Sequence, residues 1–129
     1  MGLFNLLFGK SLFGRTTVSP QTEERVKQDF AKIDGLIKLG SPSNLKEALI
    51  SSDRALDNVL KDIFSGDSMG ERLKEASTRF ERPTYNKIWE AHKVRNALVH
   101  ESNYEPPYYV TKKAIDDLRR AINILGVSV

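Results

Sequence analysis

Residues 41–66 read SPSNLKEALISSDRALDNVLKDIFSG, and this stretch decides the fold. Its apolar side chains recur at the three- and four-residue intervals that place them on one face of an α-helix. The pair Ser41-Pro42 is typical of a helix start, and Gly66 is expected to end the helix. We therefore predict one long amphipathic helix that buries an apolar stripe against other helices. The members of this stripe are Leu45, Leu49, Leu56, Val59, Leu60 and Ile63.

The segments on either side show the same helical periodicity. We expect further helices over about 20–39, 68–80 and 85–100, with a break at Pro83-Thr84 before the last of these. The pair Ser19-Pro20 is a second helix-start signal, with Ser19 as the cap of the helix over 20–39. Thr111 is expected to cap a final helix that stops at Gly126. Residues 102–107 are predicted to form a loop, because Pro106-Pro107 cannot lie inside a helix. No run of alternating apolar and polar residues predicts a strand.

These signals predict an all-α fold, an antiparallel bundle of four to five helices with short connections. At 129 residues the chain is long enough for one compact domain and too short for two ordinary ones. We assign residues 20–129 to the helical bundle. Residues 1–19 are assigned to an apolar and basic N-terminal arm with a linker.

The composition is that of a globular protein with a small basic excess. Lys and Arg total 20 and Asp and Glu total 17, which gives a net charge of +3. A charge of this size allows an anionic partner without requiring one. Cysteine is absent and only two histidines occur, so disulfides, thiolate catalysis and cysteine-type zinc sites are excluded. We expect no cofactor, no metal site and a cytoplasmic location.

Residues 1–14 are rich in Leu and Phe and contain no acidic residue. The apolar runs are shorter than the roughly 20 residues that a membrane span needs. A secretory signal is not indicated either, because the cationic start and the small-residue cleavage site are missing. Two interpretations stay open: an arm packed on the domain or on a protein partner, and a short anchor that makes the protein membrane-peripheral.

Residues 95–100 read RNALVH and are the segment best suited to chemistry. His92, Asn96 and His100 are spaced by four and form one ridge of the predicted helix, with Arg95 beside His92. A guanidinium binds phosphate through two donors, and an imidazole exchanges protons near neutral pH. Arg95 and His100 lie about 140° apart on an ideal helix. They converge only if the helix distorts near His100 or if a second copy supplies the complementary group.

Two polar residues interrupt the apolar stripe of residues 41–66. Ser52 and Asp53 stand where the stripe should continue between Leu49 and Leu56. A buried carboxylate without a partner is costly, so we predict that Asp53 pairs with Arg95 or lies within water-bridged reach of it. Such an ion pair is also the purely structural interpretation of Arg95, and it does not exclude phosphate binding.

The pattern of an arginine, four residues and a histidine on the penultimate helix of a small all-α domain resembles the HEPN superfamily (higher eukaryotes and prokaryotes nucleotide-binding domains). In this chain the pattern is Arg95 and His100, and Asn96 occupies the polar position that often follows the arginine. The longer phrase WEAHKVRNALVHE, residues 89–101, is similar to the local sequence of bacterial members. The resemblance implies a HEPN-like bundle over residues 20–129.

The resemblance also implies metal-independent RNA cleavage that leaves a 2′,3′-cyclic phosphate, in a toxin or defence role. Arg95 would hold the scissile phosphate, and His100 would transfer a proton at the 2′-hydroxyl or the leaving 5′-oxygen. Asn96 would orient His100 or the phosphate, with Asp53 and His92 in supporting positions. The implied partners are RNA or a nucleotide, a second copy in a homodimer, and an antitoxin.

Non-catalytic interpretations remain open beside this one. A HEPN-like module could bind a nucleotide, RNA or a protein partner without cleaving anything. The chain could also be an adaptor that uses its N-terminal arm to associate with a membrane. His100 could be favoured simply by the helix dipole at a C-terminal position. Tyr104 and Tyr108 flank Pro106-Pro107 and could contact RNA bases or cover the open end of the bundle.

Overall fold

The computed structural model describes residues 16–129, and in this part of the chain all regular secondary structure is helical, without strands. The elements are α2 (Pro20–Leu39), α3 (Pro42–Ile63), α4 (Met69–Glu75), the 3-10 turn η1 (Ala76–Arg79), α5 (Arg82–His100) and α6 (Tyr108–Ile124). The predicted all-α class and the bundle of four to five helices are confirmed. The predicted arm, residues 1–14, lies outside the described residues.

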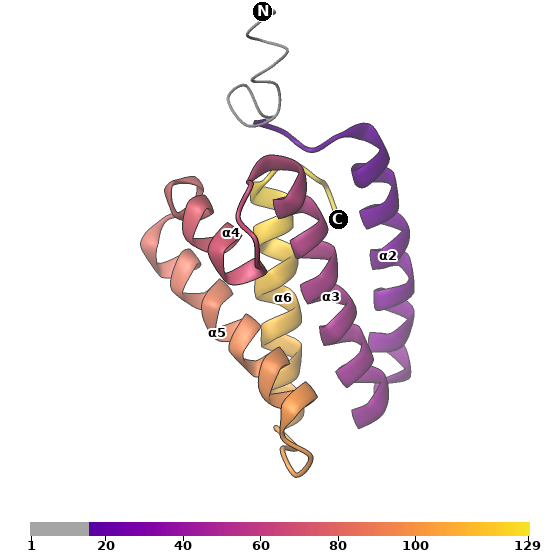
Figure 1. Ribbon diagram of the computed structural model, residues 1–129. Helices are drawn as coiled ribbons and strands as arrows, with labels where there is room; N and C mark the ends of the chain where they lie inside the picture. The colour runs from indigo at the N-terminus through magenta and orange to yellow at the C-terminus, as the bar shows by residue number, and fades with distance from the viewer. Residues whose placement is uncertain (1–15) are drawn as a thin grey trace, which may run out of the picture.

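Helices α3 and α6 lie side by side at the centre of the bundle (Figure 1). Helix α2 packs on α3, and α5 packs on α6 with a smaller contact to α3. The short α4 follows α3 and lies near the upper part of α5 in the view of Figure 1. Among the described helices, none combines the length and the apolar character needed to cross a membrane.

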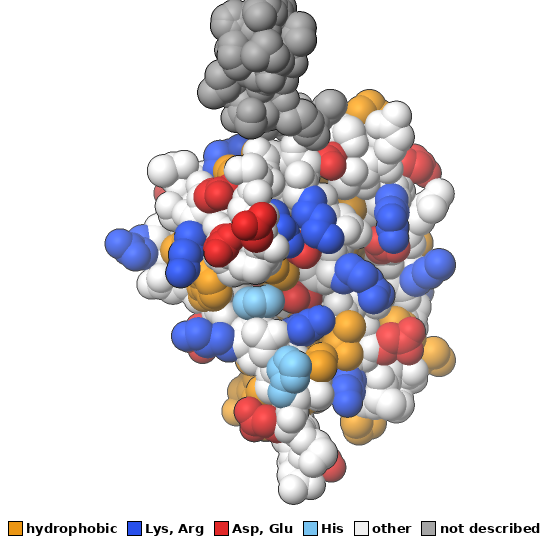
Figure 2. Space-filling view, in the orientation of Figure 1, with side chains coloured by type: hydrophobic (Ala, Val, Ile, Leu, Met, Phe, Trp, Pro, Cys, Tyr) orange, Lys and Arg blue, Asp and Glu red, His pale blue; other side chains and the backbone are white. Residues whose placement is uncertain are grey.

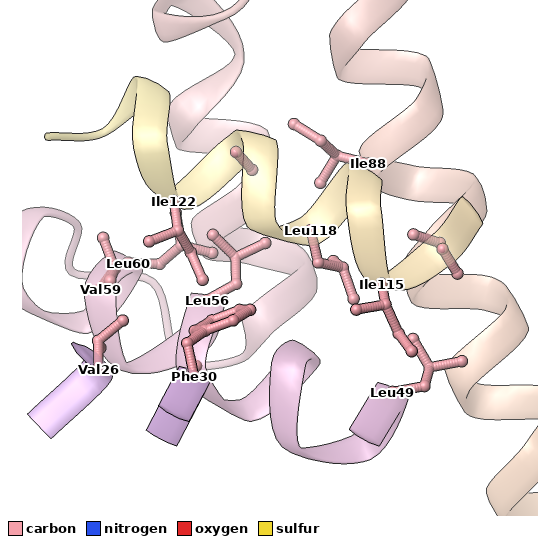
Figure 3. Close-up of a cluster of buried hydrophobic side chains, with 14 of the residues drawn as sticks. Val26, Phe30, Leu49, Leu56, Val59, Leu60, Ile88, Ile115, Leu118 and Ile122 are labelled. Carbon is pink, nitrogen blue, oxygen red and sulfur yellow. The ribbon is translucent and has the colours of Figure 1, made fainter. Parts of the chain in front are cut away.

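The hydrophobic core forms where the stripes of the long helices meet (Figure 3). The predicted stripe of α3 is buried except at its end, where Ile63 is half-buried. Each fully buried Leu, Ile, Val or Phe contributes about 1.5–3 kcal/mol relative to an exposed side chain. Fully buried members from three helices include Ile33, Leu49, Leu56, Leu60, Ile115, Leu118 and Ile122.

Side-chain caps fix the starts of α2 and α3 as the sequence predicts. The Ser19 hydroxyl accepts a hydrogen bond from the Thr22 amide at 3.2 Å, and the Ser41 hydroxyl accepts from the Asn44 amide at 3.2 Å. These bonds satisfy amides that lack partners within a helix. Gly40 ends α2 with φ of 74°, a left-handed conformation that favours glycine.

The predicted end of α3 at Gly66 is wrong, because the helix stops at Ile63 and Phe64 is extended. The extended backbone lets the Phe64 side chain pack against the core. Gly66 has a different role: a Cβ there would lie 2.9 Å from the Arg72 amide nitrogen, so this position permits close contact with α4. The Arg72 guanidinium in turn donates to the Gly66 carbonyl and to both oxygens of Asp57.

Three other predicted boundaries differ from the structure. The helix expected over 68–80 is the short α4 followed by η1. Helix α5 begins at Arg82 and includes Pro83, because the first turn of a helix needs no amide donor. Helix α6 begins at Tyr108 directly after Pro107, so Thr111 lies inside the helix, 4% exposed, and is not its cap.

Candidate functional site

Asp53 is a buried carboxylate on the inward face of α3. Its exposure is 3%, although it stands in a run of apolar core residues. The adjacent Ser52 is fully buried and satisfied locally, since its hydroxyl donates to the Ala48 carbonyl at 2.8 Å. The carboxylate of Asp53 cannot bond to a carbonyl of its own helix in this way, and it contacts side chains of α5 instead. The polar interruption of the α3 stripe therefore marks a point of contact between two helices.

His92 is the α5 side chain closest to this carboxylate. Its Nδ1 atom lies 3.0 Å from Oδ1 and 3.1 Å from Oδ2 of Asp53. The ring also meets the edge of Trp89, with centroids 6.0 Å apart. No described residue forms a hydrogen bond with His92 Nε2. The imidazole is thus oriented through Nδ1, which is how a neighbouring carboxylate commonly fixes a histidine ring.

Arg95 also contacts Asp53, as predicted from the sequence. Its Nε atom lies 3.5 Å from Asp53 Oδ2, and its Nη1 atom donates to the Asn96 side-chain oxygen at 3.0 Å. The Nε atom is buried and makes no hydrogen bond of good geometry with any described residue. The side chain is 29% exposed. The guanidinium is therefore anchored at one edge and reaches solvent at the other.

His100 does not join this group within one chain. It is the last residue of α5 and is exposed. The helix stays regular to its end, because the Glu101 amide donates to the Ala97 carbonyl at 2.9 Å. The helix distortion that could have brought His100 toward Arg95 is therefore not observed, and the two side chains remain about 140° apart around the axis.

The structure thus brings together Asp53, His92, Arg95 and Asn96, which we call the Asp53 cluster. It leaves His100 on the same helix, two turns beyond His92. Two histidine side chains are visible on one face of the molecule, surrounded by both cationic and acidic residues (Figure 2). The cluster provides a fixed imidazole and a partly exposed guanidinium, which are groups that can bind an anion.

Tyr104 and Tyr108 lie apart from the cluster, at the end of the bundle. Both line a hollow of about 440 Å³ between the start of α3, the end of α5 and the start of α6. Tyr104 is half-buried and packs against the core, and Tyr108 is 55% exposed. The two aromatic side chains therefore share one cavity wall.

The sequence pattern did not predict that His92 contacts Asp53. It predicted that Asp53 turns to Arg95, whereas the carboxylate contacts both residues and lies closer to His92. The available signal was the one-turn spacing of His92 and Arg95 opposite a polar interruption of the α3 stripe. Among residues 16–129, no three His, Cys, Asp or Glu side chains gather as metal ligands.

Comparisons of the chain with protein-family models, with curated proteins and with solved structures found no match.

Proposed function

We propose that the chain is a metal-independent endoribonuclease of HEPN type, acting in the cytoplasm in a toxin or defence role. The observation that carries the proposal is the Asp53 cluster: one buried carboxylate holds an imidazole and a guanidinium side by side on α5. Arg95 and His100 also retain the spacing of the motif on the penultimate helix. Phosphodiester cleavage needs a cation for the phosphate and a group for proton transfer, and this helix supplies both types.

In the proposed reaction Arg95 binds a non-bridging oxygen of the scissile phosphate. The ribose 2′-oxygen attacks phosphorus, its proton is removed, and the bond from phosphorus to the 5′-oxygen breaks as that oxygen receives a proton. The products are a 2′,3′-cyclic phosphate and a 5′-hydroxyl. His100 transfers a proton at one of these two oxygens. His92, fixed through Nδ1, offers Nε2 to the phosphate or the leaving oxygen and so supports Arg95.

A second copy of the chain completes the site in this proposal. His92, Arg95 and Asn96 lie within about one turn of α5, but His100 lies a further turn along the helix and about 140° from Arg95 around the axis. A two-fold axis that pairs the α5 ridges would place His100 of one copy near Arg95 of the other. Each half-site would then use the Asp53 cluster of one chain and His100 of its partner.

A non-catalytic binding module is the second candidate, and one observation favours it. Within the described part of the chain, no hydrogen bond or ion pair links His100 to Arg95 or Asn96, while Arg95 already contacts Asp53 and Asn96. A guanidinium engaged in this way can hold a nucleotide, an RNA or an acidic protein segment without cleaving it. An antitoxin partner would instead favour the ribonuclease.

Incubation of the full chain with a defined single-stranded RNA tests the first proposal. Reactions run with and without chelator, and the ends of the products are identified by their sensitivity to a cyclic phosphodiesterase. We expect chelator-resistant cleavage with cyclic phosphate ends that depends on Arg95 and His100. RNA that is bound but stays intact would favour the binding module, and RNA that is neither bound nor cut would contradict the ribonuclease and an RNA-binding module.

A further inference from the structure

The hollow at the end of the bundle is a concave site whose lining includes no member of the Asp53 cluster. It has a volume of about 440 Å³, which falls within the roughly 300–1,000 Å³ range of small-molecule sites. Its walls combine two tyrosines and two prolines with Ser43, Lys46 and Thr111. A cavity of this composition has one aromatic side and one side suited to an anion.

The aromatic side comes from the loop after α5 and the first turn of α6. Tyr104 is half-buried, and Tyr108 keeps 55% of its surface exposed at the rim. Pro106 lies between them in the loop and also lines the hollow. Flat aromatic side chains at the edge of a cavity are the usual partners of nucleobases, because every base offers a π face for stacking.

The anion-binding side comes from the first turn of α3. Pro42 has no amide proton, and the Asn44 amide is already capped by Ser41. The Ser43 amide has no acceptor among the described residues. Lys46, one turn further along, forms no ion pair with any described residue. A free amide at a helix N-terminus with an unpaired ammonium beside it favours a phosphate.

Thr111 provides an independent sign that the hollow takes a polar ligand. Its side chain lines the cavity, yet the residue is only 4% exposed. The Thr111 hydroxyl forms no hydrogen bond with any described residue. Among residues 16–129 the one fully buried side-chain polar atom without a partner is Arg95 Nε, so the Thr111 hydroxyl keeps access to the cavity and can bond a ligand there. Glu105 also lines the hollow, and its negative charge disfavours an anion close to its carboxylate.

From these features we infer that the hollow binds one nucleotide unit, with the base at Tyr104 and Tyr108 and the phosphate at Ser43 and Lys46. The unit is either a free mononucleotide or one residue of an RNA strand. The RNA strand as the source rests on the proposed function, in which His100 acts on RNA. The hollow lies near His100, because two of its lining residues, Leu98 and Ser102, flank His100 in the chain. An RNA held at His100 would then place a neighbouring nucleotide in the cavity.

Direct binding measurements on the full chain test this inference without any cleavage. The protein carries Arg95→Ala so that RNA is not consumed, and the probes are the four ribonucleoside 5′-monophosphates, their nucleosides, inorganic phosphate and a short oligoribonucleotide. Calorimetry gives the dissociation constants. We expect at least one monophosphate or the oligonucleotide to bind more tightly than the nucleosides or phosphate alone.

Three substitutions in the hollow have matched controls. Tyr108→Ala, Lys46→Ala and Thr111→Val should each weaken binding about tenfold, the scale of one lost stacking or phosphate contact. Thr111→Val keeps the side-chain shape. Weaker binding at an unchanged melting temperature would therefore be due to the loss of the hydroxyl's contact with the ligand. Tyr109→Ala is the control for Tyr108, because Tyr109 is 70% exposed and lines the groove between α5 and α6 instead. Lys74→Ala, on the exposed side of α4, controls for loss of charge.

The pattern of losses identifies the source of the nucleotide. Loss of monophosphate binding supports a free ligand, and loss of oligonucleotide binding alone supports a residue of an RNA strand. The inference is overturned if none of the three substitutions weakens any probe relative to its control. RNA cleavage by chains with an intact Arg95 is measured separately. Cleavage that persists without binding in the hollow would overturn this inference alone, and binding without cleavage would contradict only the proposed ribonuclease.

Discussion

The Nδ1 atom of His92 lies 3.0 Å from Oδ1 and 3.1 Å from Oδ2 of Asp53, a carboxylate with an exposure of only 3%. The same carboxylate also faces Arg95 Nε at 3.5 Å. One buried acid therefore connects α3 to two side chains on α5, and it fixes the direction in which both reach solvent. This shared contact is expected to stabilise the packing of α3 on α5, and it orients the two side chains to which we assign the proposed chemistry.

Asp53→Ala should destabilise the fold by about 3 kcal/mol, since it leaves Arg95 Nε buried and His92 without its partner. Urea unfolding followed by circular dichroism measures the loss. Asp116→Ala is the control: its ion pair with Lys112 is exposed, with 51% of the Asp116 side chain accessible. That change should cost less than about 1 kcal/mol. If the two substitutions lowered the free energy of unfolding equally, the buried contacts of Asp53 would stabilise the fold no more than an exposed ion pair does.

Arg95→Ala and His100→Ala should each lower RNA cleavage by about 100-fold or more, because the first removes phosphate stabilisation and the second removes proton transfer. His92→Ala should have a smaller effect, about tenfold, if His92 supports Arg95. Single-turnover rates on one labelled RNA give the comparison, and circular dichroism checks the fold. Arg25→Ala is the control, because Arg25 is exposed on α2. A larger effect of His92→Ala than of His100→Ala would assign proton transfer to His92 and the supporting position to His100.

Most of the fold could be predicted because burial on long helices follows a simple period. The stripe of α3 and the caps Ser19 and Ser41 depend on residues close in sequence, and the structure confirms them. The predicted start of α6 is wrong for a local reason: the helix begins directly after Pro107, so Thr111 lies inside it. The predicted end of α3 is wrong because Phe64 leaves the helix and packs on the core, a contact that a local pattern does not contain.

The candidate site could be predicted only in part for the same reason. The polar interruption at Asp53 indicated a buried acid that needs a cation, and the contact with Arg95 is present. Which α5 side chain approaches most closely depends on the crossing of two helices and on side-chain rotamers. His92 is held in place partly by the ring of Trp89, a contact that sequence spacing alone does not specify. The cavity shared by Tyr104 and Tyr108 likewise needs four segments brought together.

Removal of residues 1–14 should leave the melting temperature of the bundle nearly unchanged. The described helices and their core begin after this segment, with Ser19 capping α2 and its amide bound to Asp62 at 2.9 Å. Differential scanning calorimetry of full-length and shortened chains makes the comparison. A drop of more than about 5 °C, equivalent to roughly 1 kcal/mol in a domain of this size, would mean that the arm packs on the bundle.

The same shortened chain tests the alternative of membrane anchoring. Flotation with vesicles that contain anionic lipids should recover the full chain and lose the shortened one if the Leu- and Phe-rich arm inserts at the surface. Replacing Lys10 by Gln in the full chain separates charge attraction from apolar insertion. Equal flotation of full and shortened chains would assign any membrane contact to the bundle and would contradict an anchoring role for the arm.

Mixing two inactive chains tests whether the site is composite. In a regular α5, Arg95 and His100 diverge by about 140°, so we expect one phosphate to receive these two groups from different chains. An Arg95→Ala chain retains His100, and a His100→Ala chain retains Arg95. A mixed dimer should therefore contain one complete half-site and should recover up to about half of the wild-type rate per dimer. Analytical ultracentrifugation of the same samples establishes that dimers form and exchange. Mixed dimers without activity, or cleavage by a wild-type monomer, would exclude the two-fold arrangement and would require both groups to act from one chain.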